Sequence, residues 1–292
     1  MENTKSKFGL SSFWLKVFAC LFMTLDHIGL LFVVPGEPEI NTAYYILRSI
    51  GKIAFPIFVF LAVEGAYKSK NIKNYLLRLA VMALAMDAFG YIYGAMKNID
   101  IANNGLIGNV FTDLFMGVLA IYFLRKKNLY SLFVLFPIAF EFLSHLVISP
   151  TYGTLVKADW GSFSIVLFVA FFIARELADY FGKRKAISDG FDPDTYLNYE
   201  GLKARKIASV IALVSVDLIY YLIWRLNYMS PVLPNGFVPY GTFCALAGIF
   251  IALYNGERGY DPKWVKYGFY LYYPFHLILL GIVSMFCGVL AM

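Results

Sequence analysis

The chain has 292 residues, of which 60% are hydrophobic and only 15% are charged, whereas about a quarter of the residues of an average soluble domain are charged. Such a chain has too few polar side chains to cover a water-soluble globule. Its net charge of +6 does not indicate nucleic-acid binding, because the basic residues occupy short segments between apolar runs and form no basic stripe with interleaved aromatic side chains. The composition predicts an integral membrane protein, with residues 1–292 in a single domain and without a nucleic-acid partner.

Nine apolar runs follow one another along the chain, each near the ~20 residues that cross the hydrocarbon core of a bilayer. They are residues 12–34, 42–67, 74–96, 106–124, 129–149, 160–182, 204–228, 236–255 and 264–290. The first run is too long for the core of a signal peptide and is expected to be a retained helix. The pattern therefore predicts an all-α, polytopic bundle of about nine transmembrane helices.

The segments between these runs alternate in charge. Even-numbered connections are rich in Lys and Arg, as in 125–127 and 183–206, while odd-numbered ones, such as 35–39 and 229–235, are poor in them. Because cytoplasmic loops carry the excess of Lys and Arg, the sequence predicts a cytoplasmic N-terminus and a C-terminus on the outer side of the inner, cytoplasmic membrane. Residues 183–203 are expected to form a partly ordered loop.

Ionisable side chains within the apolar runs are costly to place in a bilayer and often mark a functional interior. Ion pairs between helices explain part of the set, and the remainder predicts a polar interior. No metal site is expected, because the histidines lack the spacing of metal ligands. The full set is Asp26, His27, Arg48, Lys52, Glu64, Asp87, Asp113, Glu141, His145, Arg175, Asp217 and His276.

The first run places Lys16 and His27 on one helical face, because eleven residues are close to three full turns. The two side chains are then roughly 16 Å apart along the axis, with Lys16 at the cytoplasmic edge. A long, thin cofactor could bind Lys16 through a phosphate while its reactive end reaches His27. Alternatively, Lys16 extends to the interface and His27 makes a buried hydrogen bond.

The partners of this histidine are less evident from the sequence. Asp26 is adjacent to His27, but neighbours on a helix do not face one another. A carboxylate from another helix, Asp113 or Glu64, is therefore the better candidate for orienting the imidazole. Asp26 is expected to pair with Arg48 or with a backbone group.

Two proline residues interrupt apolar runs beside candidate site residues. Pro56 follows Lys52 by four residues, and Pro274 precedes His276 by two. Proline removes a backbone donor and kinks a helix or leaves a carbonyl oxygen without its usual partner. His276 is either part of the interior site or a satisfied core histidine.

Several motifs together resemble the TraX family, from the first apolar run to the last. They are Met23-x-x-Asp26-His27-Ile28-Gly29, Arg48 to Phe55-Pro56, Val63-Glu64-Gly65, Lys73 to Leu79, Gly108-Asn109-Val110-Phe111-Thr112 and Tyr273-Pro274-Phe275-His276-Leu277. The family is named for a conjugative-plasmid protein that acetylates the N-terminus of pilin, and it is similar to the wider transmembrane acyltransferases. Those enzymes carry a basic residue, usually arginine, and a catalytic histidine on their first helix, at the positions of Lys16 and His27.

The resemblance implies an O- or N-acyltransferase that moves an acetyl group from cytoplasmic acetyl-CoA to an acceptor, a protein N-terminus or a glycan, at the membrane or beyond. His27 would be the general base or, alternatively, a nucleophile. The expected groups are His27, Asp26 and Asp113 for catalysis, Lys16, Lys52 and Glu64 for the cofactor, and Arg48, Asn109 and His276 for the acceptor.

Two further functions fit the same features. Charged interiors and proline-broken helices are also typical of secondary transporters or exporters of small polar solutes, but the chain shows no internal repeat. A non-catalytic pilus or envelope assembly factor is the third alternative, and it would tolerate loss of His27. Membrane lipids are partners in every case.

Overall fold

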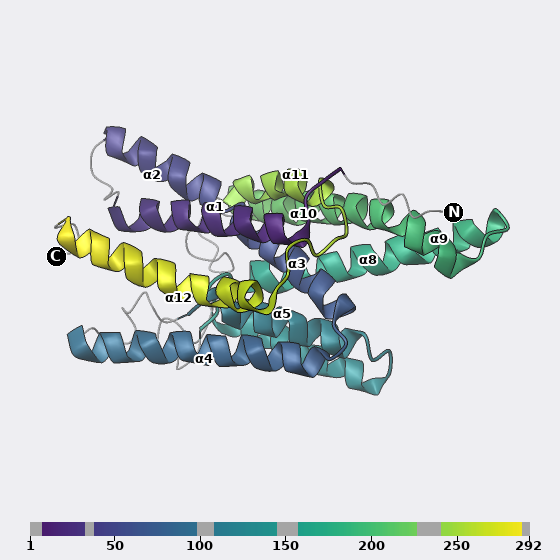
Figure 1. Ribbon diagram of the computed structural model, residues 1–292, viewed down its shortest axis with the longest axis horizontal. Coiled ribbons are helices and arrows are strands. Elements are labelled where there is room, and N and C mark those ends of the chain that lie inside the picture. Colours follow the sequence, from purple (N-terminus) through teal and green to yellow (C-terminus); the bar gives the residue numbers. More distant parts are fainter. Residues whose placement is uncertain (1–7, 33–37, 98–107, 145–156, 227–240, 288–292) are drawn as a thin grey trace. The chain divides into compact units, whose positions relative to one another are not determined.

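The computed structural model describes residues 8–32, 38–97, 108–144, 157–226 and 241–287, and nearly all of them are helical (Figure 1). The only β contact in these ranges is an isolated bridge between Leu10 and Tyr254. The elements are α1 Ser12–Phe32, α2 Pro38–Gly51, α3 Ala54–Lys68, α4 Ile72–Lys97, α5 Val110–Leu124, the 3-10 helix η2 Leu129–Val134, α6 Leu135–Leu143, α8 Ser162–Ser188, α9 Pro193–Tyr199, α10 Gly201–Leu226, the 3-10 helix η4 Gly241–Leu246, α11 Ala247–Ala252 and α12 Lys263–Phe286.

Five helical stretches are long and apolar enough to cross a membrane. They are Ser12–Phe32, Thr42–Lys68, Ile72–Met96, Gly201–Ile223 and Lys263–Ser284, and shorter apolar helices cover Val110–Leu124, Leu129–Leu143 and Gly241–Ala252. The all-α, multi-pass architecture expected from the sequence is therefore confirmed. The count of nine spans and the orientation of the termini stay predictions.

The chain divides into two compact units. Unit 1 comprises Met1–Phe58, Ala174–Asp217 and Val238–Met292, and unit 2 comprises Val59–Ile173 and Leu218–Phe237. In unit 1, α1 packs against α2 and α12. In unit 2, α5 packs against α4, η2 and α6. Each unit is described by itself below.

Two glycines allow α1 and α2 to approach closely in unit 1. A Cβ atom at Gly51 would lie less than 3.0 Å from the side chain of Asp26 on α1. A Cβ atom at Gly29 would lie 3.0 Å from the Cβ of Leu47 on α2. Without the glycines the helices would have to separate, so these positions set the distance at which charged groups of the two helices meet.

One end of unit 1 is held by backbone hydrogen bonds between segments far apart in sequence. The N–H groups of Ser12 and Phe13 donate to the carbonyl oxygens of Glu257 (2.8 Å) and Arg258 (3.1 Å). These bonds place the N-terminal end of α1 beside the segment that leads into α12. Lys206, in the first turns of α10, donates to the carbonyl oxygen of Ala252 at the end of α11.

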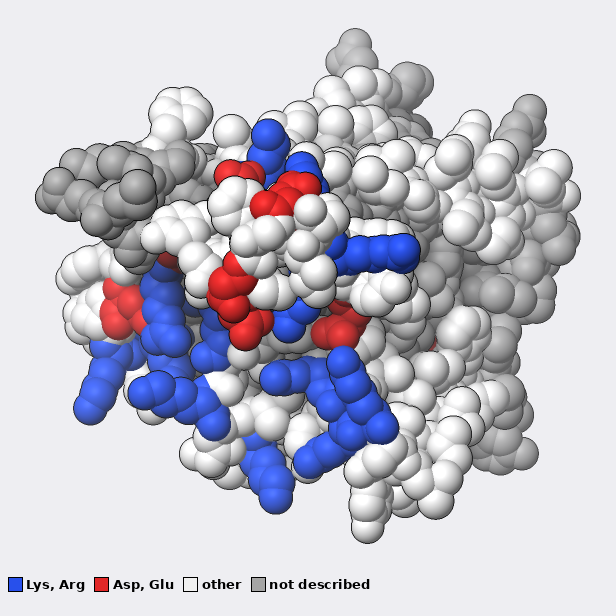
Figure 2. Space-filling model, turned by 90° about the vertical axis from the view of Figure 1, so that its right-hand side faces the viewer, with Lys and Arg blue, Asp and Glu red and all other residues white. Residues whose placement is uncertain are grey.

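Basic residues gather at this end. Lys and Arg side chains, interspersed with Asp and Glu, crowd the face shown in Figure 2. Those that unit 1 contributes near its interlocked segments are Lys16, Lys183, Arg184, Lys185, Lys203, Arg205, Lys206, Arg258, Lys263 and Lys266. The structure thus brings together basic segments that the charge pattern assigns to the cytoplasmic side.

The segment 183–203 is more regular than the expected partly ordered loop. α8 continues to Ser188, and α9 follows after a short turn. Asp192 caps α9 by accepting a hydrogen bond from the N–H of Thr195 (2.8 Å), and this bond lowers the pKa of the Asp192 carboxyl. The sequence did contain the signal for this helix, since Asp192-Pro193 is a typical N-cap followed by a first-turn proline.

Large aromatic side chains fill the core of unit 2. Phe163 and Phe168 have no exposed surface, and Phe163 packs edge-on against Tyr220. A Cβ atom at Gly117 of α5 would overlap the ring of Phe168, so this glycine makes room for a phenylalanine of α8. The close packing of α5 against α8 positions the polar groups of unit 2 considered below.

Candidate functional site

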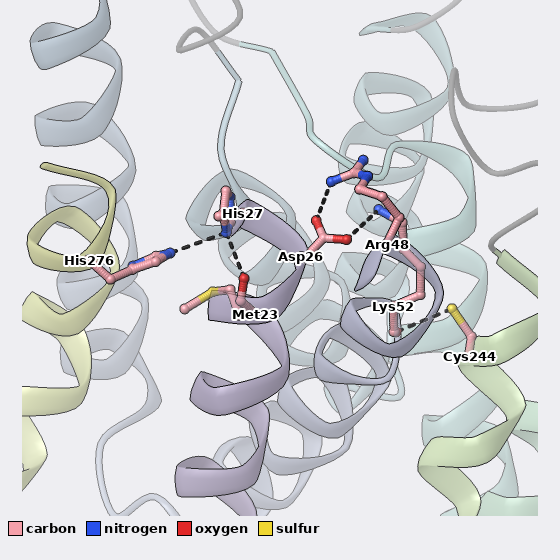
Figure 3. A network of polar contacts seen from close by, with 7 residues as sticks. All are labelled: Met23, Asp26, His27, Arg48, Lys52, Cys244 and His276. Atoms are coloured by element: carbon pink, nitrogen blue, oxygen red, sulfur yellow. Dashed lines mark hydrogen bonds and ion pairs between the residues drawn. The ribbon is translucent and has the colours of Figure 1, made fainter. Parts of the chain in front are cut away.

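Two polar clusters lie on different sides of α1 in unit 1 (Figure 3). His27 points toward α12 and meets His276, whereas Asp26 points toward α2 and meets Arg48. Consecutive residues of a helix project about 100° apart, which separates these two side chains as the sequence predicted. The histidine pair and the charge cluster are therefore distinct sites that share one helix.

The histidine pair consists of two rings in direct contact. His276 Nε2 lies 3.2 Å from His27 Nδ1, and the ring centroids are 4.9 Å apart. His276 is buried, with 3% of its surface exposed, while His27 is half-buried. The contact joins the C-terminal half of α1 to the middle of α12.

Backbone carbonyl oxygens fix the tautomer of each ring. His27 Nδ1 lies 2.8 Å from the carbonyl oxygen of Met23, and His276 Nδ1 lies 2.9 Å from that of Tyr272. A carbonyl oxygen only accepts hydrogen bonds, so each Nδ1 carries a proton. His276 Nε2 then accepts from His27 Nδ1–H, and the proton-accepting nitrogen of His27 is Nε2.

Tyrosines of α12 surround the pair. Tyr272 stacks on His276, with centroids 5.2 Å apart and planes at 10°, and Tyr273 contacts both imidazoles edge-on. The Tyr272 hydroxyl lies 2.5 Å from Thr24 Oγ1, which donates to the carbonyl oxygen of Cys20. These contacts restrict rotation of His276 and hold α12 against α1.

The sequence did not single out Thr24, Tyr272 and Tyr273 as site residues. A usable signal was present, because Tyr272-Tyr273-Pro274-Phe275-His276 places Tyr272 one turn before the histidine. The helix continues through Pro274. Since proline cannot donate a hydrogen bond to the preceding turn, the imidazole of His276 adds a side-chain donor to the carbonyl oxygens of this region.

The charge cluster joins α1 to α2 through one carboxylate and two cations. Arg48 Nη1 donates to Asp26 Oδ2 at 2.5 Å, and Lys52 Nζ lies 3.7 Å from Asp26 Oδ1. The three side chains are 12–14% exposed. The prediction that Asp26 pairs with Arg48 is confirmed, and most of the charge of Asp26 is used in this pairing rather than in orienting His27.

The cluster sits at the break between α2 and α3. α2 ends at Gly51 and α3 begins at Ala54, which places Pro56 in the first turn of α3, where its missing N–H leaves no gap in the helical bonding. The carbonyl oxygen of Lys52, exposed by this break, accepts a weak hydrogen bond from Cys244 Sγ (3.5 Å). The interruption predicted from Pro56 is confirmed.

Lys16 faces the same neighbouring helix as His27. Its Nζ lies 5.3 Å from the ring centroid of Phe269 on α12, and the side chain is half-buried. The electrostatic neighbours of Lys16 include Asp261, Arg258 and Lys266. The predicted shared face of Lys16 and His27 is thus turned toward α12, with Lys16 at the basic end of unit 1.

The remaining predicted site residues belong to unit 2 and have partners there. Glu64 forms an ion pair with Lys68 (2.9 Å), one turn along α3. Asn109 caps α5 through the N–H of Phe111 and donates to Asp87 Oδ1 (2.9 Å) on α4. These contacts give both residues structural roles, and their cofactor and acceptor roles stay predictions.

Asp113 also has partners within unit 2. Its carboxylate accepts hydrogen bonds from the backbone N–H groups of Asp159, Trp160 and Gly161, at 2.9–3.1 Å. The partner that the structure gives His27 is instead His276, which the sequence analysis had placed on the acceptor side. His145 lies outside the described residues.

Comparison with known proteins supports a membrane function related to pili. The family model described as "TraX protein" matches residues 11–284 of the chain. The chain is 27% identical, over 94% of its length and 96% of the relative's, to a "Probable fimbrial assembly protein FimC, serogroup H1" of Dichelobacter nodosus. No solved structure matches the chain.

Proposed function

Because the chain belongs to the TraX family, we propose that it is a membrane-embedded acyltransferase that moves an acetyl group from acetyl-CoA to a surface-directed acceptor. The similarity to a protein named for fimbrial assembly makes a pilin N-terminal amine the first acceptor to test. The acyltransferase superfamily, the inner membrane and the cytoplasmic source of acetyl-CoA are parts of this proposal.

The observation that carries the proposal is the tautomer of His27. Its Nδ1–H is directed at the Met23 carbonyl oxygen and at His276 Nε2, which leaves Nε2 as the basic nitrogen. A histidine oriented through one ring nitrogen and basic at the other is the arrangement that general-base catalysis requires. The half-buried position of His27 allows an acceptor group to approach.

The reaction balances with this histidine alone as the proton carrier. His27 Nε2 takes the proton of the acceptor amine or hydroxyl as its nitrogen or oxygen bonds to the thioester carbonyl carbon. When the tetrahedral intermediate collapses, the carbon–sulfur bond breaks and His27 returns the proton to the departing thiolate. The products are the acetylated acceptor and free CoA.

His276 supports the transient imidazolium. When Nε2 of His27 is protonated, its Nδ1–H becomes a stronger donor, and the 3.2 Å contact to His276 Nε2 strengthens with it. His276 must remain neutral for this, and its Nδ1–H bond to the Tyr272 carbonyl oxygen keeps the lone pair of Nε2 on the side of His27. We therefore assign His276 a positioning role.

Lys16 is the proposed contact for the phosphates of CoA. It lies at the basic end of unit 1, three helical turns before His27 on the face toward α12. The separation of roughly 16 Å along the helix suits a carrier whose charged end and thioester are joined by a long arm. Lysine binds phosphate as a point charge, so we expect Lys16→Ala to raise KM for acetyl-CoA more than it lowers kcat.

The direct test measures free CoA released from acetyl-CoA by the detergent-purified protein in the presence of a pilin N-terminal peptide. Wild type should release CoA, and His27→Ala should lose roughly 10²–10⁴-fold of that rate, the usual contribution of a general base. Trp14→Phe, an exposed position on the same helix, is the matched control and should retain activity. Failure of the wild type to bind acetyl-CoA would overturn the enzyme assignment in favour of a transporter.

A further inference from the structure

Unit 2 contains a pair of buried carboxyl groups whose arrangement does not depend on acyl transfer. Asp113 is in the first turn of α5, and Glu141 is in α6, which packs against α5. Both residues have 0% of their surface exposed. Two acidic side chains in contact inside an apolar unit need an explanation, because each would be costly as an isolated charge.

Asp113 is equipped to remain a carboxylate. Oδ2 accepts the N–H of Asp159 at 2.9 Å, and Oδ1 accepts those of Trp160 at 3.0 Å and Gly161 at 3.1 Å. Three backbone donors stabilise a negative charge. They also fasten the turn before α8 to the start of α5.

Glu141 has the opposite environment. Within the described part of the chain, neither of its carboxyl oxygens accepts a hydrogen bond, although both are fully buried. The charged groups that act on it are Asp113 and Asp159, and both are acidic. A second carboxylate here would be buried without a donor and repelled by its neighbour, which is strongly unfavourable.

We propose that Asp113 and Glu141 form a binding site for one proton. Glu141 holds it as a carboxylic acid and donates it in a hydrogen bond to the Asp113 carboxylate. The shared proton satisfies the oxygens that otherwise lack a partner and halves the charge of the pair. It also links α6 to α5 and, through the three N–H donors of residues 159–161, to the start of α8.

The first test detects the proton directly. Infrared difference spectra of wild type minus Glu141→Gln at neutral pH should contain the carbonyl band of a protonated carboxylic acid, which shifts in heavy water. Glutamine is the uncharged isostere and can donate an N–H to Asp113, so this variant should fold. Absence of the band from the difference spectrum would overturn the proposal.

The second test uses stability against pH in the full-length protein. An unfolded glutamate loses its proton above about pH 4.3, so retention of the proton by the folded pair makes wild-type stability fall as pH rises into the alkaline range. The melting temperature of Glu141→Gln should fall clearly less over that range. An equal fall in both proteins would refute the site.

Two controls separate this site from its alternatives. His145, four residues after Glu141 in sequence, also titrates, and His145→Gln should keep the wild-type pH dependence. Replacing choline by sodium at fixed ionic strength should leave the melting temperature unchanged. A saturable rise with sodium that is lost in Glu141→Gln would replace the proton by a metal cation and overturn the proposal as stated.

Discussion

At the scale of single residues, His276 is the group whose role the structure specifies most closely. It accepts through Nε2 from His27 and donates through Nδ1 to the Tyr272 carbonyl oxygen. Its predicted effect on catalysis is therefore indirect. A variant should change how well His27 accepts and returns a proton, and should leave the binding of acetyl-CoA largely unaltered.

We expect His276→Leu to lower kcat for CoA release at least about tenfold with little change in KM, because His27 loses the acceptor that orients its Nδ1–H. His276→Gln, whose side-chain oxygen can accept that bond, should recover part of the rate. The pH profile of kcat should also move in His276→Leu, since the imidazolium of His27 loses a hydrogen bond. Equal losses in both variants with an unchanged pH profile would indicate a purely structural role.

The residue scale also shows what the sequence could and could not predict. Helical periodicity alone placed Lys16 and His27 on one face and separated Asp26 from His27, and the pairing of Asp26 with Arg48 followed from the need to neutralise a charge in an apolar run. The partner of His27 was missed. Asp113 and Glu64 were favoured because carboxylates are common partners of histidine, but contacts between distant helices depend on packing that a single sequence does not reveal.

At the scale of elements, the contact between α1 and α2 depends on glycine. A side chain at Gly51 would meet Asp26 at less than 3.0 Å, and the displaced carboxylate could no longer pair with both Arg48 and Lys52. The α2–α3 break beside it was predictable from Pro56. The regularity of α9 was not predicted, because the polar composition of 183–203 outweighed its capping signal.

Gly51→Ala should therefore destabilise the protein by about 1–3 kcal/mol, the usual cost of overpacking, and lower its melting temperature in detergent. Gly268→Ala is the matched control, since a Cβ there meets nothing within 4 Å on α12. Alanine also favours helix over glycine by about 1 kcal/mol, so the control should be neutral or stabilised. Similar melting temperatures for the two variants would show that α1 and α2 tolerate a wider separation.

At the scale of the whole molecule, composition and the apolar runs correctly predicted an all-helical membrane protein. Five helical stretches satisfy the length and polarity of a span, and α8 is long but continues into the charged sequence that ends at Ser188. Charge bookkeeping along the chain is the argument for nine crossings. The grouping of basic residues at one end of unit 1 agrees with it, because a consistent alternation of loops requires those segments to lie on one side of the membrane.

The parity of the crossings can be tested with thiols. Cys287 is exposed, whereas Cys20 and Cys244 are buried, so a membrane-impermeant maleimide reports mainly on the end of α12. With nine crossings and a cytoplasmic N-terminus, Cys287 should react in intact spheroplasts. Ser188→Cys in a Cys287→Ser background, in the exposed turn after α8, should react only after the membrane is permeabilised. Labelling of both positions from the same side would rule out an odd number of crossings between the basic end and the C-terminus, and with it the orientation in which acetyl-CoA reaches Lys16 from the cytoplasm.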